Sequence, residues 1–561
     1  MINTISSAKK EIKEIVMNAL GRLISEGKLP SEAIPAFTVE IPNDKNHGDF
    51  SCNVALVSAK AFRQNPRNIA AMIVENSVLE GSVFEKIELA GPGFLNFFAG
   101  RTWFSETVNA VLTEKENYGK TNDGEGKRVL VEFVSANPTG PMHIGNARGG
   151  ALGDCLASLL QYAGYYVERE FYINDAGNQI NKFALSLDIR YRQHFGDPVE
   201  MPEDSYHGQD IIDHIENFSE IYGDKYINAD EQTRRQALVD YALPINIKGL
   251  ETDLLKYRIK YDTWFRESTL HNDGSVAEII ELLKEKGYTY EQDGALWFKS
   301  SELGDDKDRV LIRANGVPTY SVPDIAYHYN KLIKRGFDIA IDVLGADHHG
   351  YVPRMRAALT ALGVDASRLD VVIMQMVLLV RNGETVKLSK RSGKAITLST
   401  LLDEIPMDAA RFFFNLRDPN THFEFDLDLA IEESSKNPVY YVQYAHARIC
   451  RIIEKQAEEG NTCDFIPESR MVFTETAELE LIRHIAGLPD IISEGAKNYN
   501  PSVITRYLIE LAQHFHKFYD SCPIKGTEKT VLQSRLSLCT ATKTVLKNLL
   551  DLLKVDAPEK M

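Results

Sequence analysis

Cysteine and tryptophan are scarce in this sequence, with six and three residues among 561. The cysteines are scattered, and no two stand at the two-residue separation typical of zinc or redox sites, so we expect reduced, structural thiols. No uncharged apolar run is long enough to cross a bilayer, and the first residues lack the apolar core and cleavage site of a signal peptide. The sequence therefore predicts a cytoplasmic protein with no membrane partner.

The sequence also lacks an excess of positive charge, since 63 lysines and arginines face 80 aspartates and glutamates, for a formal net charge of −17. This balance argues against a protein that coats nucleic acid through its overall field. It does not exclude RNA, because phosphate binding depends on a local basic strip and not on the sum of charges. No repeat of fixed period is evident, which argues against a solenoid.

The length and patterning predict three domains of a multidomain α/β protein. Residues 1–118 begin with an amphipathic helix and continue as a small α+β domain. Residues 119–436 open with an apolar strand at 128–133 and alternate helices with strands, which is typical of a Rossmann-like parallel sheet. A charged stretch with largely helical patterning at about 182–303 predicts a helical insertion in that domain. Residues 437–561 have the helical periodicity of a bundle.

The first chemical motif follows the strand at 128–133. There the segment SANPTGPMHIGNARGGALGDCLASLL reads as a Pro/Gly-rich turn before a helix that starts near Asn146. Such a turn brings ligands to a helix N-terminus, where backbone N–H groups favour phosphate, and His143 and Asn146 offer further donors. Alternatively, it is a plain strand–turn–helix with an incidental histidine. The glycines that allow backbone or nucleotide to approach closely are Gly145, Gly149, Gly150 and Gly153.

A second motif, TVKLSKRSGKAITL, follows an Asn-Gly turn and forms a basic loop that would otherwise be a solvated surface segment. Together the two segments resemble the HIGH and KMSKS motifs of class I aminoacyl-tRNA synthetases, in the same order. The resemblance implies that positioning and electrostatics carry the attack on ATP. It assigns catalysis to His143, Asn146, Lys387 and Lys390, and ATP binding to Pro138, Gly140, His143, Gly145, Asn146, Ser389 and Lys390.

One departure from the first motif is visible, because its last histidine is Asn146 here. An amide can donate a hydrogen bond but cannot become cationic, which leaves its share of the catalysis open.

The chain resembles arginyl-tRNA synthetases nearly from end to end. The matching segments are GDFSCNVA, GPGFLNF, VEFVSANPTGPMHIGN, FYINDAGNQI, GVPTYSVPDIAYH, VLGADHHGYVPRM and the terminal APEKM. The resemblance implies a monomeric ligase that activates L-arginine with ATP and transfers it to the 3′ end of tRNA(Arg). It further implies Mg²⁺ bound with ATP, no tightly bound cofactor, and activation that needs bound tRNA.

An arginine pocket requires carboxylates arranged for a planar guanidinium, whose donor fork is best satisfied by bidentate acceptors. His348 and His349 beside Asp347 could instead suggest a metal pair, but adjacent side chains on an extended strand point to opposite faces, so we expect no metal site. The resemblance assigns the amino-acid pocket to Glu132, Asn137, Tyr320, Asp324 and Asp347.

Tyr441, Tyr444 and Arg448 are three and four residues apart and therefore share one face of a helix. Tyrosines and a guanidinium can stack on unpaired bases, although the same rings could simply fill the bundle core. This helix resembles the opening of the family's anticodon-binding domain, which favours RNA, and the N-terminal domain resembles its module for the outer corner of tRNA. The resemblance adds Phe515, Tyr519 and Met561 to the tRNA-binding set.

Two other functions fit parts of the pattern. A small-molecule nucleotidyltransferase could use the same HIGH-type turn, but such enzymes usually lack a long helical tail for RNA. A non-catalytic RNA-binding paralogue would keep the fold, but intact His143, Lys387 and Lys390 argue against it.

Overall fold

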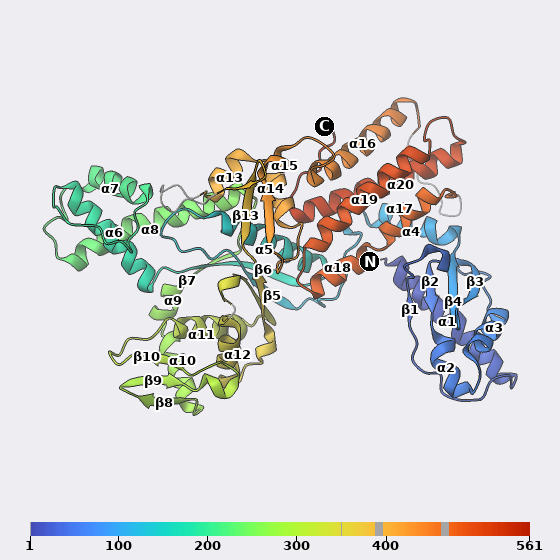
Figure 1. The fold of residues 1–561 in the computed structure, drawn as a ribbon, viewed down its shortest axis with the longest axis horizontal. Helices are drawn as coiled ribbons and strands as arrows, with labels where there is room; N and C mark the ends of the chain where they lie inside the picture. The colour runs from blue at the N-terminus through green and yellow to red at the C-terminus, as the bar shows by residue number, and fades with distance from the viewer. Residues whose placement is uncertain (1, 349, 387–395, 462–470) are drawn as a thin grey trace.

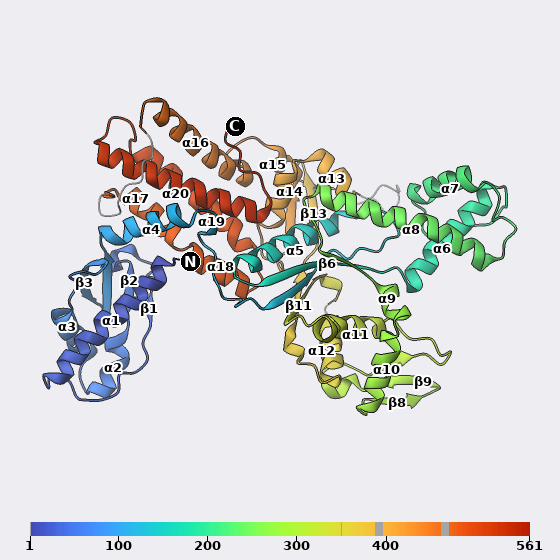
Figure 2. The ribbon, with the colours of Figure 1, turned by 180° about the vertical axis from the view of Figure 1, so that it is seen from behind.

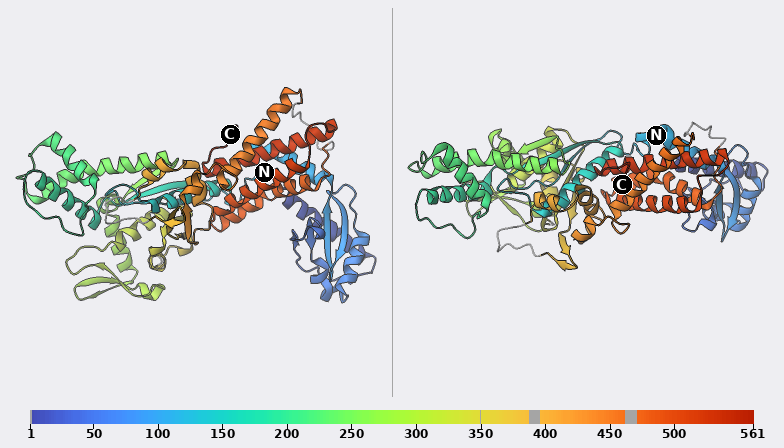
Figure 3. Two further views of the ribbon diagram at one scale, coloured as in Figure 1. Left: turned by 45° about the horizontal axis from the view of Figure 1, so that its top comes forward. Right: turned by 90° about the horizontal axis from the view of Figure 1, so that it is seen from above.

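The computed structural model describes residues 2–348, 350–386, 396–461 and 471–561, which form an elongated molecule with the α/β domain at its centre (Figure 1, Figure 3). The N-terminal region lies at one end and a helical arm at the other. None of the described helices has the combination of length and apolar character needed to cross a membrane. The described cysteines are all free thiols, namely Cys52, Cys155, Cys450, Cys522 and Cys539.

The N-terminal region packs three helices against a four-stranded antiparallel sheet with strand order β1-β2-β4-β3. Helix α1 begins after Asn3, whose side chain accepts a hydrogen bond from the Ser6 N–H at 2.8 Å. Apolar side chains from Ile5 to Leu23 lie buried along one stripe, so the predicted amphipathic helix is confirmed. The elements are α1 (Thr4–Ser25), β1 (Val39–Glu40), β2 (Phe50–Cys52), α2 (Val54–Phe62), α3 (Pro66–Asn76), β3 (Phe84–Ala90), β4 (Phe94–Ala99) and α4 (Arg101–Glu114).

Five parallel strands in the order β12-β11-β5-β6-β7 form the central sheet, which confirms the predicted Rossmann-like class. Helix α5 connects β5 to β6 and is buried along nearly its whole length, because the sheet covers one side and C-terminal helices cover the other. The elements are β5 (Arg128–Glu132), α5 (Ile144–Tyr162), β6 (Tyr166–Ile173), β7 (Thr263–Arg266), β11 (Ile339–Gly345), α12 (Tyr351–Ala361) and β12 (Leu369–Met374).

The range predicted as one insertion contains two excursions from the sheet, because the short strand β7 returns to the sheet between them. A four-residue strand has too little periodicity to be recognised within a charged stretch of sequence. The first excursion is a helical arm with its own core, formed by α6 (Gly177–His194), α7 (Gln209–Tyr222) and α8 (Glu231–Lys256). The second contains α9 (Glu267–Asn272), α10 (Ser275–Glu285), the antiparallel strands β8 (Thr289–Gln292), β9 (Ala295–Phe298) and β10 (Arg309–Ile312), α11 (Ser321–Tyr329) and a π-helical turn, Asn330–Lys334.

The C-terminal helices form the predicted bundle, which packs over α4 and α5 (Figure 2). Arg411 joins the bundle to helix α5, since its Nη2 donates to Asp154 Oδ2 at 2.5 Å and its Nε donates to the Leu553 carbonyl at 2.7 Å. A small sheet of order β14-β13-β15 precedes the bundle. The elements are β13 (Val377–Arg381), β14 (Glu384–Thr385), α13 (Leu398–Glu404), α14 (Met407–Phe414), β15 (Phe423–Asp426), α15 (Leu427–Ile431), α16 (Pro438–Glu458), α17 (Thr476–Ala486), α18 (Leu488–Lys497), α19 (Ser502–Ser521) and α20 (Lys529–Leu553).

Candidate active site

The turn after β5 holds two consecutive residues in left-handed backbone. Val134 has φ 71° and Ser135 has φ 40°, a region that residues with side chains avoid at a cost of about 1 to 3 kcal/mol each. Side-chain contacts fix the turn, because Ser135 Oγ donates to Glu132 Oε1 at 2.8 Å and accepts from the Tyr172 N–H at 3.1 Å. Glu132 is thereby held at the carboxyl end of β5, where it lines a cleft.

The first predicted motif forms the N-terminus of α5. The His143 N–H donates to Asn146 Oδ1 at 3.2 Å, and the Asn146 N–H donates to the His143 carbonyl at 2.9 Å. Asn146 therefore uses its side-chain oxygen to cap the helix, which leaves its amide nitrogen as a donor. Gly145 has open space around it and lines the cleft, whereas a side chain at Gly153 would come within 2.3 Å of the Phe133 ring. Gly145 thus leaves room for a ligand, and Gly153 serves helix–turn packing.

The end of the second motif's segment pairs with the first motif. The Ile144 N–H donates to the Ile396 carbonyl at 3.2 Å, and the Leu398 N–H donates to the Met142 carbonyl at 2.9 Å. Backbone hydrogen bonds therefore connect the two motif regions, although they are far apart in the sequence. The predicted residues of the second motif, Lys387, Ser389 and Lys390, lie outside the described part of the chain.

A cleft of about 640 Å³ opens at the carboxyl ends of β5, β6, β11 and β12. Parallel α/β sheets bind ligands at this edge, because strand ends and helix N-termini converge there. The N-terminus of α5 forms one wall, and the positive end of the helix dipole there favours phosphate oxygens. Acidic side chains form another wall. The predicted residues that line the cleft are Glu132, Gly145, Asn146, Asp324 and Asp347.

Asp324 is a half-buried carboxylate in the first turn of α11. Its side chain makes no ion pair or hydrogen bond with any residue that the structure describes. Burial raises the pKa of Asp324 to about 7; His328 opposes this shift, and the charges of Glu267 and Glu132 reinforce it. Glu132 differs, because its Oε2 already accepts from Lys331 Nζ at 2.5 Å. A cation that entered the cleft would supply the positively charged partner that the Asp324 carboxylate lacks.

The other residues predicted for the arginine pocket are more exposed. Tyr320 has 71% of its surface exposed, and Asn137 is exposed as well. Asp347 lines the cleft, but its side chain is 84% exposed and its Oδ2 lies 3.7 Å from His348 Nε2. The structure therefore brings Glu132 and Asp324 together at the buried part of the cleft and leaves the remaining three towards solvent.

The predicted ATP-binding turn also contacts the helical arm. Pro138 is buried, and its carbonyl accepts from Asn246 Nδ2 on α8 at 3.0 Å. Gly140 lines a neighbouring hollow formed with α7 and α8. His143 itself is exposed at the start of α5. The position of the turn therefore depends on the arm as well as on the sheet.

Sequence reasoning does not single out three residues that shape the cleft. Tyr172 and Tyr351 line it. Arg148 is fully buried and donates to the carbonyls of Gln375 at 2.6 Å and Asp418 at 3.1 Å, which fixes the strand end beside the cleft. Burial lowers the pKa of Arg148 to about 10. A signal was present, since Tyr172 belongs to FYINDAGNQI and Arg148 lies two residues after Asn146 in the segment of the first motif.

Three of the residues predicted to bind RNA, Tyr441, Tyr444 and Arg448, line a groove of about 450 Å³ between α16 and α19. Tyr444 is 41% exposed, and its ring stacks on Tyr440 at 6.4 Å and on His516 at 6.1 Å between centres. The Arg448 guanidinium lies 4.0 Å from the ring centre of Tyr519. The groove therefore offers an exposed stack of rings beside a cation.

The remaining members of that set differ in exposure. Phe515 has no exposed surface and packs in the bundle core. Tyr441 is half-buried against His516 at 5.0 Å, and Met561 is 52% exposed at the end of the C-terminal tail. The groove residues that sequence reasoning missed are Tyr440, His516 and Asp520.

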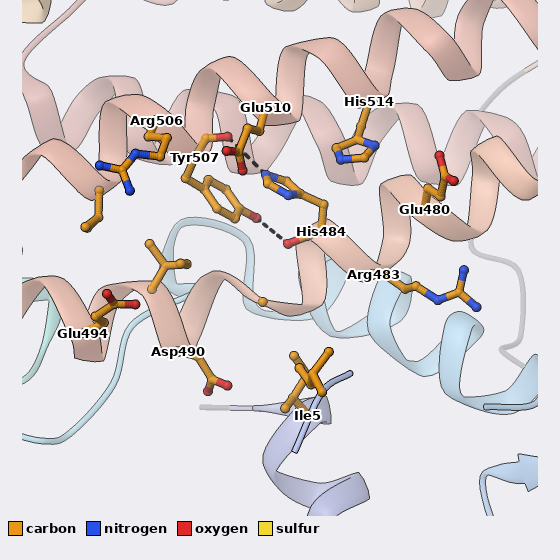
Figure 4. Close-up of a pocket in the computed structure, with 14 residues that line it drawn as sticks. Ile5, Glu480, Arg483, His484, Asp490, Glu494, Arg506, Tyr507, Glu510 and His514 are labelled. Atoms are coloured by element: carbon orange, nitrogen blue, oxygen red, sulfur yellow. Dashed lines mark hydrogen bonds between the residues drawn. The ribbon is translucent and has the colours of Figure 1, made fainter. Parts of the chain in front are cut away.

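A separate hollow of about 500 Å³ lies between α1 and helices α17 to α19 (Figure 4). In its wall, His484 stacks on Tyr507 at 4.2 Å, His484 Nε2 donates to the Tyr507 carbonyl at 3.1 Å, and Tyr507 Oη donates to the His484 carbonyl at 2.9 Å. Burial lowers the pKa of His484 to about 4, so the ring is neutral. None of the residues predicted for a site lines this hollow, which is a joint between the N-terminal region and the bundle.

The fold and the cleft define a class I aminoacyl-tRNA synthetase, because a parallel sheet carries a HIGH-like helix start at its carboxyl edge and precedes a helix bundle. The family model described as "tRNA synthetases class I (R), catalytic domain" matches residues 107–449. The model "Arginyl tRNA synthetase N terminal domain" matches residues 10–99, and "DALR anticodon binding domain" matches residues 442–561.

Individual relatives agree with these models. The chain is 52% identical to an arginine–tRNA ligase of Caldanaerobacter subterraneus subsp. tengcongensis, over 100% of both chains. A solved structure described as a putative arginyl-tRNA synthetase of Campylobacter jejuni is 35% identical, with a TM-score of 0.74 over 82% of this chain and 100% of that one. The Thermus thermophilus arginyl-tRNA synthetase, at 22% identity, has the same fold, with a TM-score of 0.73 over 99% and 100% of the chains. The chain belongs to the arginyl-tRNA synthetase family, and its activity is that of an arginine–tRNA ligase.

Proposed function

We propose that the cleft holds arginine with its guanidinium against Asp324 and Glu132 and holds ATP against the N-terminus of α5. The observation that carries this proposal is the half-buried Asp324, which forms no described ion pair and lies in the same cleft as the N-terminus of α5. A guanidinium is a planar cation with paired N–H donors, so two neighbouring carboxylates satisfy it well. Asn137, Tyr320 and Asp347 complete the pocket at its exposed side.

Activation then joins the two ligands. The arginine carboxylate attacks the α-phosphorus of ATP, a P–O bond forms to give arginyl-adenylate, and pyrophosphate leaves. The protein supplies position and electrostatic stabilisation, with no covalent bond of its own. Mg²⁺ arrives with ATP and neutralises phosphate charge. In this proposal His143, Asn146, Lys387 and Lys390 stabilise the developing charge, and Pro138, Gly140, Gly145 and Ser389 complete the ATP site.

Transfer follows when a terminal ribose hydroxyl of tRNA(Arg) attacks the arginyl carbonyl and AMP leaves. The groove of Tyr441, Tyr444 and Arg448, with Tyr519 beside Arg448, stacks on unpaired bases, and its exposed rings support this role. Met561 extends the RNA surface, and Phe515 supports the rings from the core. In this proposal the domain of residues 1–118 contacts the outer corner of tRNA, the domain of residues 119–436 carries the chemistry, and the domain of residues 437–561 binds the anticodon. The protein acts as a cytoplasmic monomer.

Arginine-dependent exchange of pyrophosphate into ATP tests the proposal. Exchange should be nearly absent without RNA and should appear with cognate tRNA, because bound tRNA shifts the catalytic loops towards a competent arrangement. Lys390→Ala should lower the exchange rate at least about a hundredfold and leave arginine binding nearly intact, because a lysine of this loop acts on transition-state charge. The exposed Lys497→Ala provides the matched control. An unchanged rate in Lys390→Ala would remove that residue from the assignment.

A further inference from the structure

A lysine with no exposed surface lies directly behind the acidic wall of the cleft. Lys331 belongs to the π-helical turn that continues α11, and its Nζ donates to Glu132 Oε2 at 2.5 Å and to Asp342 Oδ1 at 2.8 Å. The same ammonium lies 4.0 Å from the ring centre of Tyr327. π-helical turns are rare and often occur at functional sites, because they re-aim a side chain relative to an α-helix.

Lys331 belongs to a larger buried group of charges. Arg335 forms an ion pair with Glu170 at 2.6 Å, and Tyr327 Oη donates to the other oxygen of Glu170 at 2.7 Å. His328 Nε2 donates to Asp342 Oδ2 at 2.7 Å, while its Nδ1 faces the Asp324 carbonyl at 2.8 Å.

Every carboxylate of this group has a described partner behind the pocket. Glu132 and Asp342 accept from Lys331, Asp342 also accepts from His328, and Arg335 pairs with both Glu170 and Glu168. The coulombic pull of Lys331 holds the pKa of Asp342 well below its usual range despite burial, and those carboxylates raise the pKa of Lys331 in turn. Asp324 lies in front of this group and lacks such a partner among the described residues. It is therefore the uncompensated anion of the pocket.

We propose that Lys331 is the positioning residue of the arginine pocket, which fixes Glu132 for the guanidinium and leaves Asp324 as the surplus negative charge that selects a cation. This inference rests on the proposed function, because it takes Glu132 and Asp324 to be the arginine acceptors. Lys331 does not contact the substrate and acts through Glu132.

Two contacts make the position of Glu132 unique. Lys331 Nζ holds Oε2 and Ser135 Oγ holds Oε1, so the plane of the carboxylate cannot rotate. Each oxygen keeps a second lone pair, so the fixed carboxylate can still accept from a guanidinium. Without Lys331, Glu132 and Asp342 would face each other as buried anions, and a proton or a changed rotamer would relieve the repulsion. Either response would prevent the Glu132 carboxylate from accepting two hydrogen bonds from one guanidinium.

The decisive variant removes Lys331 together with one of its two counter-charges. Lys331→Met alone should lower the melting temperature, because it leaves buried carboxylates unpaired. Lys331→Met combined with Asp342→Asn restores the charge balance and should recover most of the stability. In this double variant the KM for arginine should stay raised at least about tenfold, while the KM for ATP stays within about twofold, because Glu132 remains unfixed. A double variant with the arginine KM of the unmodified enzyme would reduce Lys331 to a structural residue and overturn the inference.

Asp342→Asn alone supplies a second test that does not depend on the double variant folding. In this variant the Lys331 ammonium faces Glu132 without Asp342 as a second partner, and the stronger pairing weakens the Glu132 carboxylate as an acceptor for the substrate. The KM for arginine should therefore rise about threefold or more. A purely structural network predicts an unchanged arginine KM and would contradict the proposal.

Glu132→Gln and Asp324→Asn separate this inference from the proposed function. If both raise the KM for arginine but the variants at Lys331 and Asp342 do not, the positioning role is wrong and the pocket stands. If neither Glu132→Gln nor Asp324→Asn changes it, the proposed pocket is wrong, and the positioning role is overturned with it.

Discussion

The cleft and the aromatic groove differ in how their side chains are held in place and in how far those side chains are exposed. At the cleft, Glu132 is held by a turn with two left-handed residues and by a buried lysine, and Asp324 lies half-buried in the first turn of α11. At the groove, Tyr444 is 41% exposed and is placed by stacking on Tyr440 and His516. The first surface depends on charge in a partly desolvated setting, and the second on exposed ring area.

This difference fits the ligands that we propose for the two surfaces. A free amino acid offers one guanidinium, so discrimination must come from a few strong, directed, charge-assisted hydrogen bonds. An RNA loop offers several unpaired bases, each with a flat face, so stacking supplies affinity without requiring buried charge. The comparison predicts large, substrate-specific effects of substitution at the cleft and smaller, RNA-specific effects at the groove.

The largest effect should come from Asp324→Asn, which removes the uncompensated carboxylate and keeps its shape. The kcat/KM for arginine should fall about a hundredfold or more, corresponding to about 3 kcal/mol, because a charged acceptor in a desolvated pocket is lost. The KM for ATP should change little. Steady-state kinetics for both substrates, with the exposed Asp224→Asn as control, test this expectation. Equal losses of kcat/KM for arginine and ATP would contradict the proposal that the two ligands bind to different walls of the cleft.

Tyr444→Ala should have the next largest effect and should act on RNA alone. Stacking on an unpaired base contributes about 1 to 3 kcal/mol, so the tRNA concentration needed for half-maximal exchange should rise about tenfold. The KM for arginine should not change. The exposed Tyr166→Ala at the start of β6 is the matched control, since it removes a surface ring outside the groove. An unchanged tRNA requirement would remove the groove from the RNA surface.

The pH dependence of arginine use should follow the pKa of Asp324, which burial raises from 3.8 to about 7. Arginine remains cationic, so its KM should fall about tenfold from about pH 6 to about pH 8 as Asp324 ionises, and the KM for ATP should lack this step.

Stability should change in the opposite direction without substrate. The raised pKa means that the contribution of Asp324 is fully present below its unfolded pKa of 3.8 and is lost as pH rises through about 7. Thermal melts of the free enzyme and of Asp324→Asn should diverge across that interval. A melting profile identical for both proteins would show that Asp324 titrates normally.

The smallest effect should come from Asp347→Asn, within the same cleft. Its side chain is 84% exposed, so water already screens its charge, and the KM for arginine should rise less than about threefold. Comparison of the arginine KM in this variant with that in Asp324→Asn sharpens the contrast between buried and exposed carboxylates. A loss as large as that of Asp324→Asn would show that Asp347 is enclosed when arginine binds.

Much of the fold could be predicted because its signals are local. The amphipathic stripe of α1, the apolar run of β5 and the Pro/Gly turn before α5 each lie within about twenty consecutive residues, so periodicity and turn chemistry identify them. The short strand β7 carries no such signal, and it divides the predicted insertion in two. Similarly, exposed and buried rings look alike in sequence, which is why Phe515 in the core was grouped with Tyr444 on the surface.

The sequence by itself determined the class of enzyme, the order of its regions and the position of the two motifs in the chain, because these are properties of neighbouring residues. Only the tertiary structure decided which charges meet. Lys331 and Glu132 are 199 positions apart and share a hydrogen bond, whereas Asp324, seven positions before Lys331, has no described counter-charge. The free energy of a charge depends on the partners and the solvent within a few ångströms of it, and folding alone brings those together.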